Sequence, residues 1–113
     1  MPFINTKVNV KISDSVLENL KTKYGKAISL IPGKSEEWLM LNFEDDCRMY
    51  FKGKAAPMAF IEVKIYGKGT PEGYKNLTAE LTNIISGELN IKPEQVFIKY
   101  EEIGVWGWNG NNL

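Results

Sequence analysis

Residues 60–100 read FIEVKIYGKGTPEGYKNLTAELTNIISGELNIKPEQVFIKY, and this stretch decides the fold. Residues 60–66 alternate apolar and polar side chains, which is typical of a half-buried strand. Thr70 and Pro71 then predict a helix start, because threonine caps helices and proline suits their first position. Apolar side chains recur at helical spacing after this point, and the run VFIKY at 96–100 predicts a second strand. The stretch is therefore a strand–helix–strand unit.

The same order of elements occurs in the first half of the chain. Residues 3–10 alternate as a strand, and Ser15 and Glu18 have the spacing of a capping box at a helix start. Apolar residues then recur at helical spacing until Pro32, and residues 38–43 (WLMLNF) return to the alternation of a strand. The chain is thus predicted to contain two β-α-β units.

The two units form a pseudo-repeat, at about 2–53 and 59–110. A shift of about 57 residues, which places Ile4 on Ile61, brings the units into register, although few residues are identical. Residues 48–51 (RMYF) are a candidate for a short edge segment in the first unit. The repeat predicts one domain that covers the whole chain.

This repeat predicts an α+β fold. The two strands of each β-α-β unit run parallel, with the helix as a right-handed crossover. Two units give a four-stranded mixed sheet with both helices on one face. The apolar residues predicted to lie under the helices are Ile4, Val8, Leu39, Leu41, Ile61, Val63, Val96 and Ile98.

The opposite face of the sheet is predicted to be too apolar to remain in water. An exposed face of this character usually marks a surface for association, so the pattern predicts an oligomer. The residues on this face are Phe3, Met40, Asn42, Phe60, Phe97 and Lys99.

The composition excludes several classes of function. Lys+Arg and Asp+Glu balance at 14 each, which gives no electrostatic basis for binding nucleic acid or a membrane surface. The single Cys47 excludes an internal disulfide and a CxxC redox or zinc motif, and no metal or cofactor is expected. No signal-peptide pattern or membrane-spanning run occurs, so we expect a protein that is cytoplasmic, or secreted without a signal peptide.

Pro2 is the strongest candidate for a catalytic group. If Met1 is removed, Pro2 carries a secondary α-amine, which titrates about two units or more below a lysine. Burial and a neighbouring cation would lower its pKa further and leave a base near neutral pH, in a chain that has no histidine. The alternative is that Pro2 only opens an edge strand, a position where proline is tolerated.

Several short motifs follow one another at the spacing of a known family. They are Met1-Pro2, Gly33-Lys34, Tyr66-Gly67-Lys68-Gly69, the run 91–100 and Gly107-Trp108-Asn109-Gly110. Over essentially its full length the chain resembles the macrophage migration inhibitory factor and D-dopachrome tautomerase branch of the tautomerase superfamily. The resemblance implies a homotrimer whose sheets form a barrel, with active sites between subunits. It also implies keto–enol tautomerase activity with the N-terminal proline as acid and base.

The resemblance assigns roles residue by residue. Pro2 matches the catalytic base, and Lys34 matches the cation that holds the substrate carboxylate. Phe97 and Lys99 match positions that the family supplies across the subunit interface. The remaining positions that line the pocket are Met40, Tyr66, Trp106 and Trp108.

Three features depart from the family pattern. Phe97 stands where the mammalian cytokine has a tyrosine, so a hydroxyl that could bond an enol oxygen is lost. Lys99 replaces an asparagine, and it either adds a second carboxylate contact or crowds the pocket. The family's CxxC is absent, because residues 57–61 read PMAFI, so thiol oxidoreductase activity is not carried over.

Physical chemistry supports the assigned roles of Pro2 and Lys34. Moving a carbon-bound proton requires a neutral base and a cation near the developing enolate. A lysine about 6 Å from the proline nitrogen disfavours its protonation by roughly 3 kcal/mol at an effective dielectric near 20, or about two pKa units. The alternatives are a solvated Lys34 after a helix-ending glycine, and tryptophans that cap the sheet edge or pack a trimer interface.

The expected substrate is a small, carboxylate-bearing aromatic 2-oxo acid such as phenylpyruvate. One rival is a cytokine-like or other binding protein with a vestigial pocket, which the departures at Phe97 and Lys99 favour. A second rival is a related enzyme that uses Pro2 on a halogenated acrylate or malonate semialdehyde. Hydrolytic relatives of that kind generally need additional arginines, and this chain has only Arg48.

Overall fold

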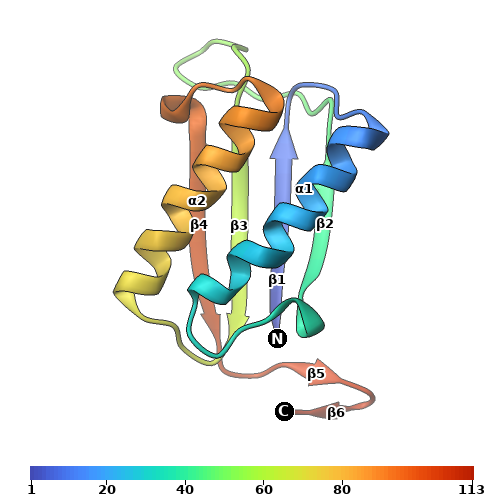
Figure 1. Cartoon of the computed structure of the whole chain (residues 1–113), viewed down its shortest axis with the longest axis vertical. Helices are drawn as coiled ribbons and strands as arrows, with labels where there is room; N and C mark the ends of the chain where they lie inside the picture. The colour runs from blue at the N-terminus through green and yellow to red at the C-terminus, as the bar shows by residue number, and fades with distance from the viewer.

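The computed structural model describes all 113 residues and confirms the predicted α+β fold (Figure 1). The main elements are β1 (Pro2–Val8), α1 (Asp14–Ala27), β2 (Met40–Glu44), β3 (Ala59–Tyr66), α2 (Pro71–Leu89) and β4 (Val96–Ile103). The short elements are the 3-10 turns η1 (Ile28–Leu30), η2 (Glu36–Trp38) and η3 (Pro93–Gln95), and the strands β5 (Gly107–Trp108) and β6 (Asn111–Asn112).

The four long strands form one mixed sheet in the order β2-β1-β3-β4. The pairs β1–β2 and β3–β4 are parallel, and the central pair β1–β3 is antiparallel. Ile4 pairs with Leu41 and Ile61 pairs with Ile98, so the two halves use the same offset between paired residues. Both helices lie on one face of this sheet, as the repeat predicted (Figure 1).

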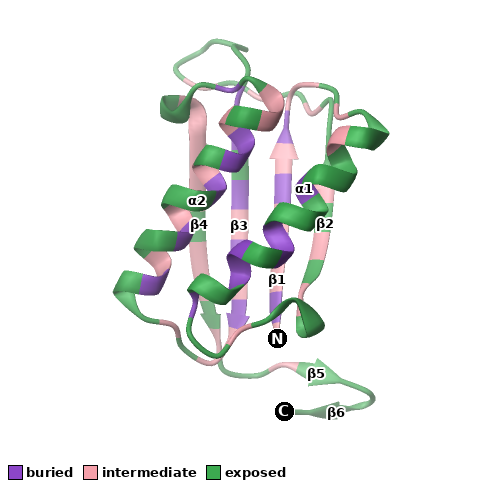
Figure 2. Cartoon of the chain, in the orientation of Figure 1, coloured by how far each residue is buried: buried purple, intermediate pink, exposed green.

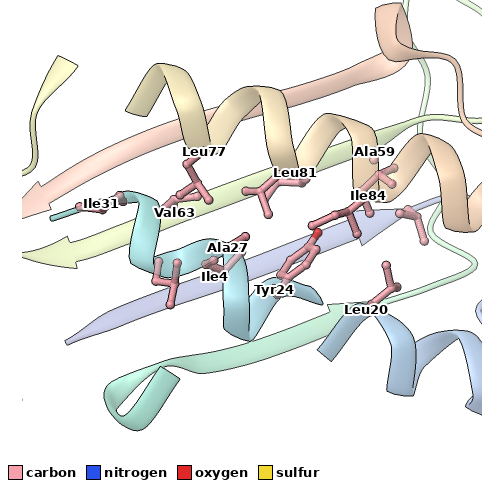
Figure 3. Close-up of a cluster of buried hydrophobic side chains, with 14 of the residues drawn as sticks. Ile4, Leu20, Tyr24, Ala27, Ile31, Ala59, Val63, Leu77, Leu81 and Ile84 are labelled. Carbon is pink, nitrogen blue, oxygen red and sulfur yellow. The ribbon is translucent and has the colours of Figure 1, made fainter. Parts of the chain in front are cut away.

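The core lies between the two helices and the sheet (Figure 3). Exposure alternates along β1 and β3, so the odd-numbered side chains of β3 point under the helices, while the outward faces of both helices are exposed (Figure 2). Inside the core, the hydroxyls of Thr6 and Tyr24 share a hydrogen bond of 2.9 Å. All eight residues predicted for this face belong to the core or pack against it.

Helix α1 begins earlier than the predicted capping box. Its N-cap is Ser13, whose hydroxyl accepts the N–H of Val16 at 3.3 Å, so the capping role predicted for Ser15 is wrong. The helix ends at Ala27 and continues as the tighter η1, because a 3-10 turn commonly closes a helix end. Helix α2 begins as predicted, with Thr70 as N-cap and Pro71 in the first turn.

The segments outside the long strands differ from prediction. Trp38 belongs to η2 rather than to a strand, and β2 begins only at Met40. The predicted edge segment at 48–51 contributes no named strand, only an isolated bridge between Phe51 and Lys54. The tail forms the small hairpin β5–β6, which was not predicted.

The open face of the sheet is less apolar than predicted. Alternation with Phe3, Phe60 and Phe97 places a belt of charged and amide side chains on this face. Lys7 and Lys99 both approach Glu62, at 3.5 and 3.4 Å. The polar residues of this belt are Asn5, Lys7, Asn42, Glu44, Glu62, Lys64, Lys99 and Glu101.

Neither α1 nor α2 combines the length and the apolar composition that a membrane-spanning helix needs.

Candidate active site

A cavity of about 350 Å³ opens where β1 begins, between the sheet edge and the C-terminal hairpin. It brings together four of the predicted site residues, which come from β1, β2 and the tail. Pro2 is buried there, whereas Met40 is 66% exposed at its side. The lining residues are Met1, Pro2, Phe3, Trp38, Met40, Trp106, Gly107 and Trp108.

The position of Pro2 is fixed by the central strand pair. Pro2 lies opposite Ile65 in the antiparallel β1–β3 ladder. Proline donates no ladder hydrogen bond, and the next bond is made by the N–H of Tyr66, which donates to the carbonyl of Met1 at 3.0 Å. The end of β3 therefore holds the Met1–Pro2 peptide at the edge of the cavity.

Lys34 reaches the same end of β3 from the connection that follows α1. Gly33 adopts a φ of 82°, which favours glycine and turns the chain after η1. The half-buried Lys34 ammonium then donates to the carbonyl of Tyr66 at 2.9 Å. Lys34 is thus tied to the sheet, rather than extended into solvent.

The chain's amino group lies within the electrostatic influence of Lys34. Burial is the larger cause, and the positive charge of Lys34 the second, of a lowered pKa for the amino group at Met1. Both effects disfavour the charged form of an amine. The site therefore favours a neutral amine at the end of this chain.

An aromatic wall surrounds the cavity. The rings of Trp38 and Trp108 meet edge-to-face, with centroids 5.6 Å apart and planes at 86°. The tail is folded back by the N–H of Leu113, which donates to the carbonyl of Trp106 at 2.9 Å. Trp38 and Phe3 were not predicted as pocket residues. No motif marked Trp38, because it opens the run 38–43, whose alternation is typical of a strand.

Phe97 and Lys99 do not reach this cavity within one chain. Phe97 lines a second cavity of about 520 Å³ on the open sheet face, with its ring 4.7 Å from Phe51. The Lys99 ammonium contacts Glu101 at 2.7 Å and Glu62 at 3.4 Å. The hydrogen bond and charge of Glu101, followed by those of Glu62, raise the pKa of Lys99.

The side chain of Tyr66 is half-buried, and its backbone groups rather than its ring make the hydrogen bonds to Met1 and Lys34. No cluster of three or more His, Cys, Asp or Glu side chains suited to a metal ion occurs in the chain. The side chains that line the cavity are apolar, and Lys34 with the backbone of Tyr66 lies at the neighbouring end of β3, outside that lining.

All 113 residues match the family described as Macrophage migration inhibitory factor (MIF). The chain belongs to the MIF family. It is 31% identical to macrophage migration inhibitory factor from Xenopus laevis, over 100% of this chain and 99% of that protein. It is 25% identical to D-dopachrome decarboxylase-B from the same organism, over 97% and 95% of the two chains.

A solved structure supports the same family and the fold. The chain superimposes on the crystal structure of Leishmania major MIF2 with a TM-score of 0.93 and 33% identity, covering 100% of this chain and 97% of that one. The predicted resemblance to the MIF branch is thus confirmed over the full length.

Proposed function

We propose that this chain, once Met1 is removed, is a keto–enol tautomerase for a small aromatic 2-oxo acid such as phenylpyruvate. The observation that supports the proposal is the aromatic cavity around buried Pro2. At this cavity, burial and the positive charge of Lys34 lower the pKa of the chain's amino group. A base of lowered pKa beside a cation is the arrangement that enolisation requires.

Removal of Met1 would change two groups at once. The Pro2 nitrogen becomes a secondary amine instead of an amide, and it gains a usable lone pair. The N–H of Tyr66 loses its acceptor, because that acceptor is the carbonyl of Met1. The processed site therefore offers a free base and a free backbone donor side by side, with the Lys34 ammonium 2.9 Å from the carbonyl of Tyr66.

The proposed reaction is a proton transfer within one substrate molecule. The substrate carboxylate binds Lys34 and the N–H of Tyr66, and its ring lies against the tryptophans. The Pro2 nitrogen takes a proton from carbon 3, the electrons of that bond form the C2–C3 double bond, and the carbonyl electrons move to oxygen. Protonated Pro2 then returns the proton to this oxygen, so no oxidant or cofactor is consumed.

We propose further that the protein assembles as a homotrimer and that a neighbouring subunit completes the cavity. The open sheet face supports association because it exposes apolar side chains, including Phe60 at 37% and Met40 at 66%. Phe97 and Lys99 lie on this face, away from the Pro2 cavity of their own chain. They are the residues expected to reach a neighbour's site.

The decisive experiment compares phenylpyruvate tautomerisation by the processed protein with that by a form that retains Met1. Retention leaves Pro2 as an amide, so turnover should fall by roughly 10²–10⁴, the range for positioned acid–base groups. Intact mass identifies each form, and equal melting temperatures establish that the fold is unchanged. Equal rates would exclude the amine from the chemistry.

A second candidate function is that of a cytokine-like or other binding protein with a vestigial pocket. Phe97 lacks a hydroxyl, and Lys99 is occupied by Glu101 and Glu62. A processed protein that turns over neither phenylpyruvate nor a halogenated acrylate would favour this function. Turnover of the halogenated acrylate alone would instead favour the hydrolytic rival.

A further inference from the structure

The loop that follows β3 is held by an acidic side chain and a tyrosine. The Tyr74 hydroxyl donates to Glu102 Oε2 at 2.7 Å. The N–H of Gly69 donates to the same carboxylate oxygen and to the Tyr74 hydroxyl, at 3.0 Å each. We call these three residues the Glu102 clamp; it joins α2, β4 and the loop between β3 and α2.

The clamp is closely fitted. A Cβ atom added to Gly69 would come within 2.6 Å of the Tyr74 ring, so only glycine leaves room for this contact. The Tyr74 ring packs on Tyr100 with centroids 4.5 Å apart, and the Tyr100 hydroxyl donates to the carbonyl of Tyr74 at 3.1 Å. The position of the Tyr74 hydroxyl is therefore determined from both sides.

The clamp is connected, through the loop from Gly67 to Gly69, to the peptide that holds Lys34. The carbonyl of the Tyr66–Gly67 peptide accepts a hydrogen bond from the Lys34 ammonium. The N–H of the same peptide donates to the carbonyl of Ile103 at 2.9 Å. Glu102 precedes Ile103 on β4 and pairs with Ile65. Both ends of the short loop from Gly67 to Gly69 are thus attached to adjacent residues of β4.

Gly67 makes the orientation of this peptide sensitive to the loop. Its φ of 84° lies in the left-handed region, which glycine adopts without strain, so the peptide has little steric preference of its own. The hydrogen bond from its N–H to Ile103 and the contacts farther along the loop together select its orientation. Burial and the hydrogen bond to Glu102 raise the pKa of Tyr74 to about 12, so the hydroxyl remains a donor at neutral pH.

We infer that Glu102 and Tyr74 are positioning residues that set the location of the Lys34 ammonium, through Gly69 and the Tyr66–Gly67 peptide. The inference rests on the proposed function, in which Lys34 binds the substrate carboxylate and acts on the Pro2 amine. Loss of the clamp lets the Tyr66–Gly67 peptide rotate, and the Lys34 ammonium then moves away from the Pro2 amine. A small misplacement of a binding group has a large effect on a reaction that depends on orientation.

The experiment measures the pKa of the Pro2 amine by NMR titration of the processed protein, a readout that requires no turnover. Glu102→Leu and Tyr74→Phe should each raise this pKa, as Lys34→Ala should. The KM for phenylpyruvate should rise by roughly tenfold, less than the hundredfold that a misplacement of about 1 Å can cost, with kcat less affected. Glu102→Gln keeps an acceptor oxygen and should lie between wild type and Glu102→Leu.

Glu88→Gln is the matched control, because Glu88 also links two elements, through Lys23 and Asn19, but on the helix side. The inference is overturned if Lys34→Ala raises the Pro2 pKa while the clamp variants leave pKa and KM at wild-type values. It is also overturned if Lys34→Ala itself changes nothing. If Glu102→Leu does not fold, Tyr74→Phe replaces it as the test, because this variant removes only one oxygen from the clamp. A wild-type protein without turnover refutes the proposed function, and the titration still tests the clamp.

Discussion

The role proposed for Lys34 combines substrate binding with an effect on the catalytic amine. Lys34→Ala removes a cation that lowers the pKa of the neighbouring amine, so the pKa of Pro2 should rise and less neutral base remains at a given pH. The acidic limb of the kcat/KM profile should therefore move to higher pH, and KM for phenylpyruvate should increase. Steady-state kinetics across pH measures both effects.

The control for Lys34→Ala is Lys75→Ala, which removes an exposed lysine on α2 that makes no ion pair. Its profile should match that of the wild type. If Lys34→Ala also matches the wild type, Lys34 serves only to connect the chain to β3.

The cavity lining predicts a preference among aromatic substrates. The side chains that surround Pro2 are mainly carbon, Phe97 has no hydroxyl, and Lys99 is held by Glu101. A para-hydroxyl on the substrate ring would lose water without a suitable partner, which costs about 1–3 kcal/mol. We expect kcat/KM for phenylpyruvate to exceed that for 4-hydroxyphenylpyruvate by roughly fivefold or more.

The measurement is a competition assay with both substrates. Equal kcat/KM values would contradict this description of the pocket and would direct attention to the neighbour's Lys99 as a partner for the hydroxyl. Lys99→Ala would then reveal whether that contact exists.

At the level of residues, the sequence predicted part of the candidate site. Pro2, Met40, Trp106 and Trp108 meet in one cavity. Trp38 was missed because the run from 38 to 43 alternates like a strand, whereas residues 36–38 form a 3-10 turn. The backbone groups of Tyr66 could not be predicted, because main-chain hydrogen bonds at a site leave no pattern of side-chain types.

At the level of elements, the N-terminus of α2 offers a direct test of how sequence determines local structure. The Thr70 hydroxyl accepts the N–H of Gly73 at 3.0 Å, which satisfies a donor that the helix leaves free. Thr70→Ala should reduce the free energy of unfolding by about 1 kcal/mol, as measured by urea denaturation. Thr70→Ser should restore most of it.

Thr82→Ala is the matched control within the same helix. The Thr82 hydroxyl donates to the carbonyl of Thr78 in the middle of α2, where alanine has the better helix propensity. Its free energy of unfolding should stay near that of the wild type. A loss as large as that of Thr70→Ala would show that the capping bond is not the cause.

The sequence predicted the long elements and not the short ones, for a physical reason. Burial of one face imposes a periodicity on β1, β3 and α2, and the pattern of apolar residues records it. The two-residue strands β5 and β6 are too short for any periodicity. The start of α1 was also misplaced, because the capping-box spacing pointed to Ser15, whereas the hydroxyl of Ser13 accepts the N–H of Val16.

At the level of the whole molecule, the open sheet face combines two kinds of surface. Phe60 and Phe97 stack at 6.5 Å near one end, next to Phe51. The centre carries the ion pairs that Lys7 and Lys99 each form with Glu62. This arrangement differs from the usual interface, whose centre is apolar and whose rim is polar, because here the charged pairs lie in the centre.

Phe60 provides the test of assembly, because its side chain lies on that face and is 37% exposed. The wild type should scatter light as a particle of about three times 12.8 kDa at micromolar concentration. Phe60→Asp places a charge in the proposed interface, so the mass should fall toward the monomer and phenylpyruvate turnover should fall with it. Leu30→Asp, equally exposed on the helix side, should leave the mass unchanged. A fully active monomer would contradict a site shared between subunits, because Phe97 and Lys99 could then never reach a neighbour's Pro2.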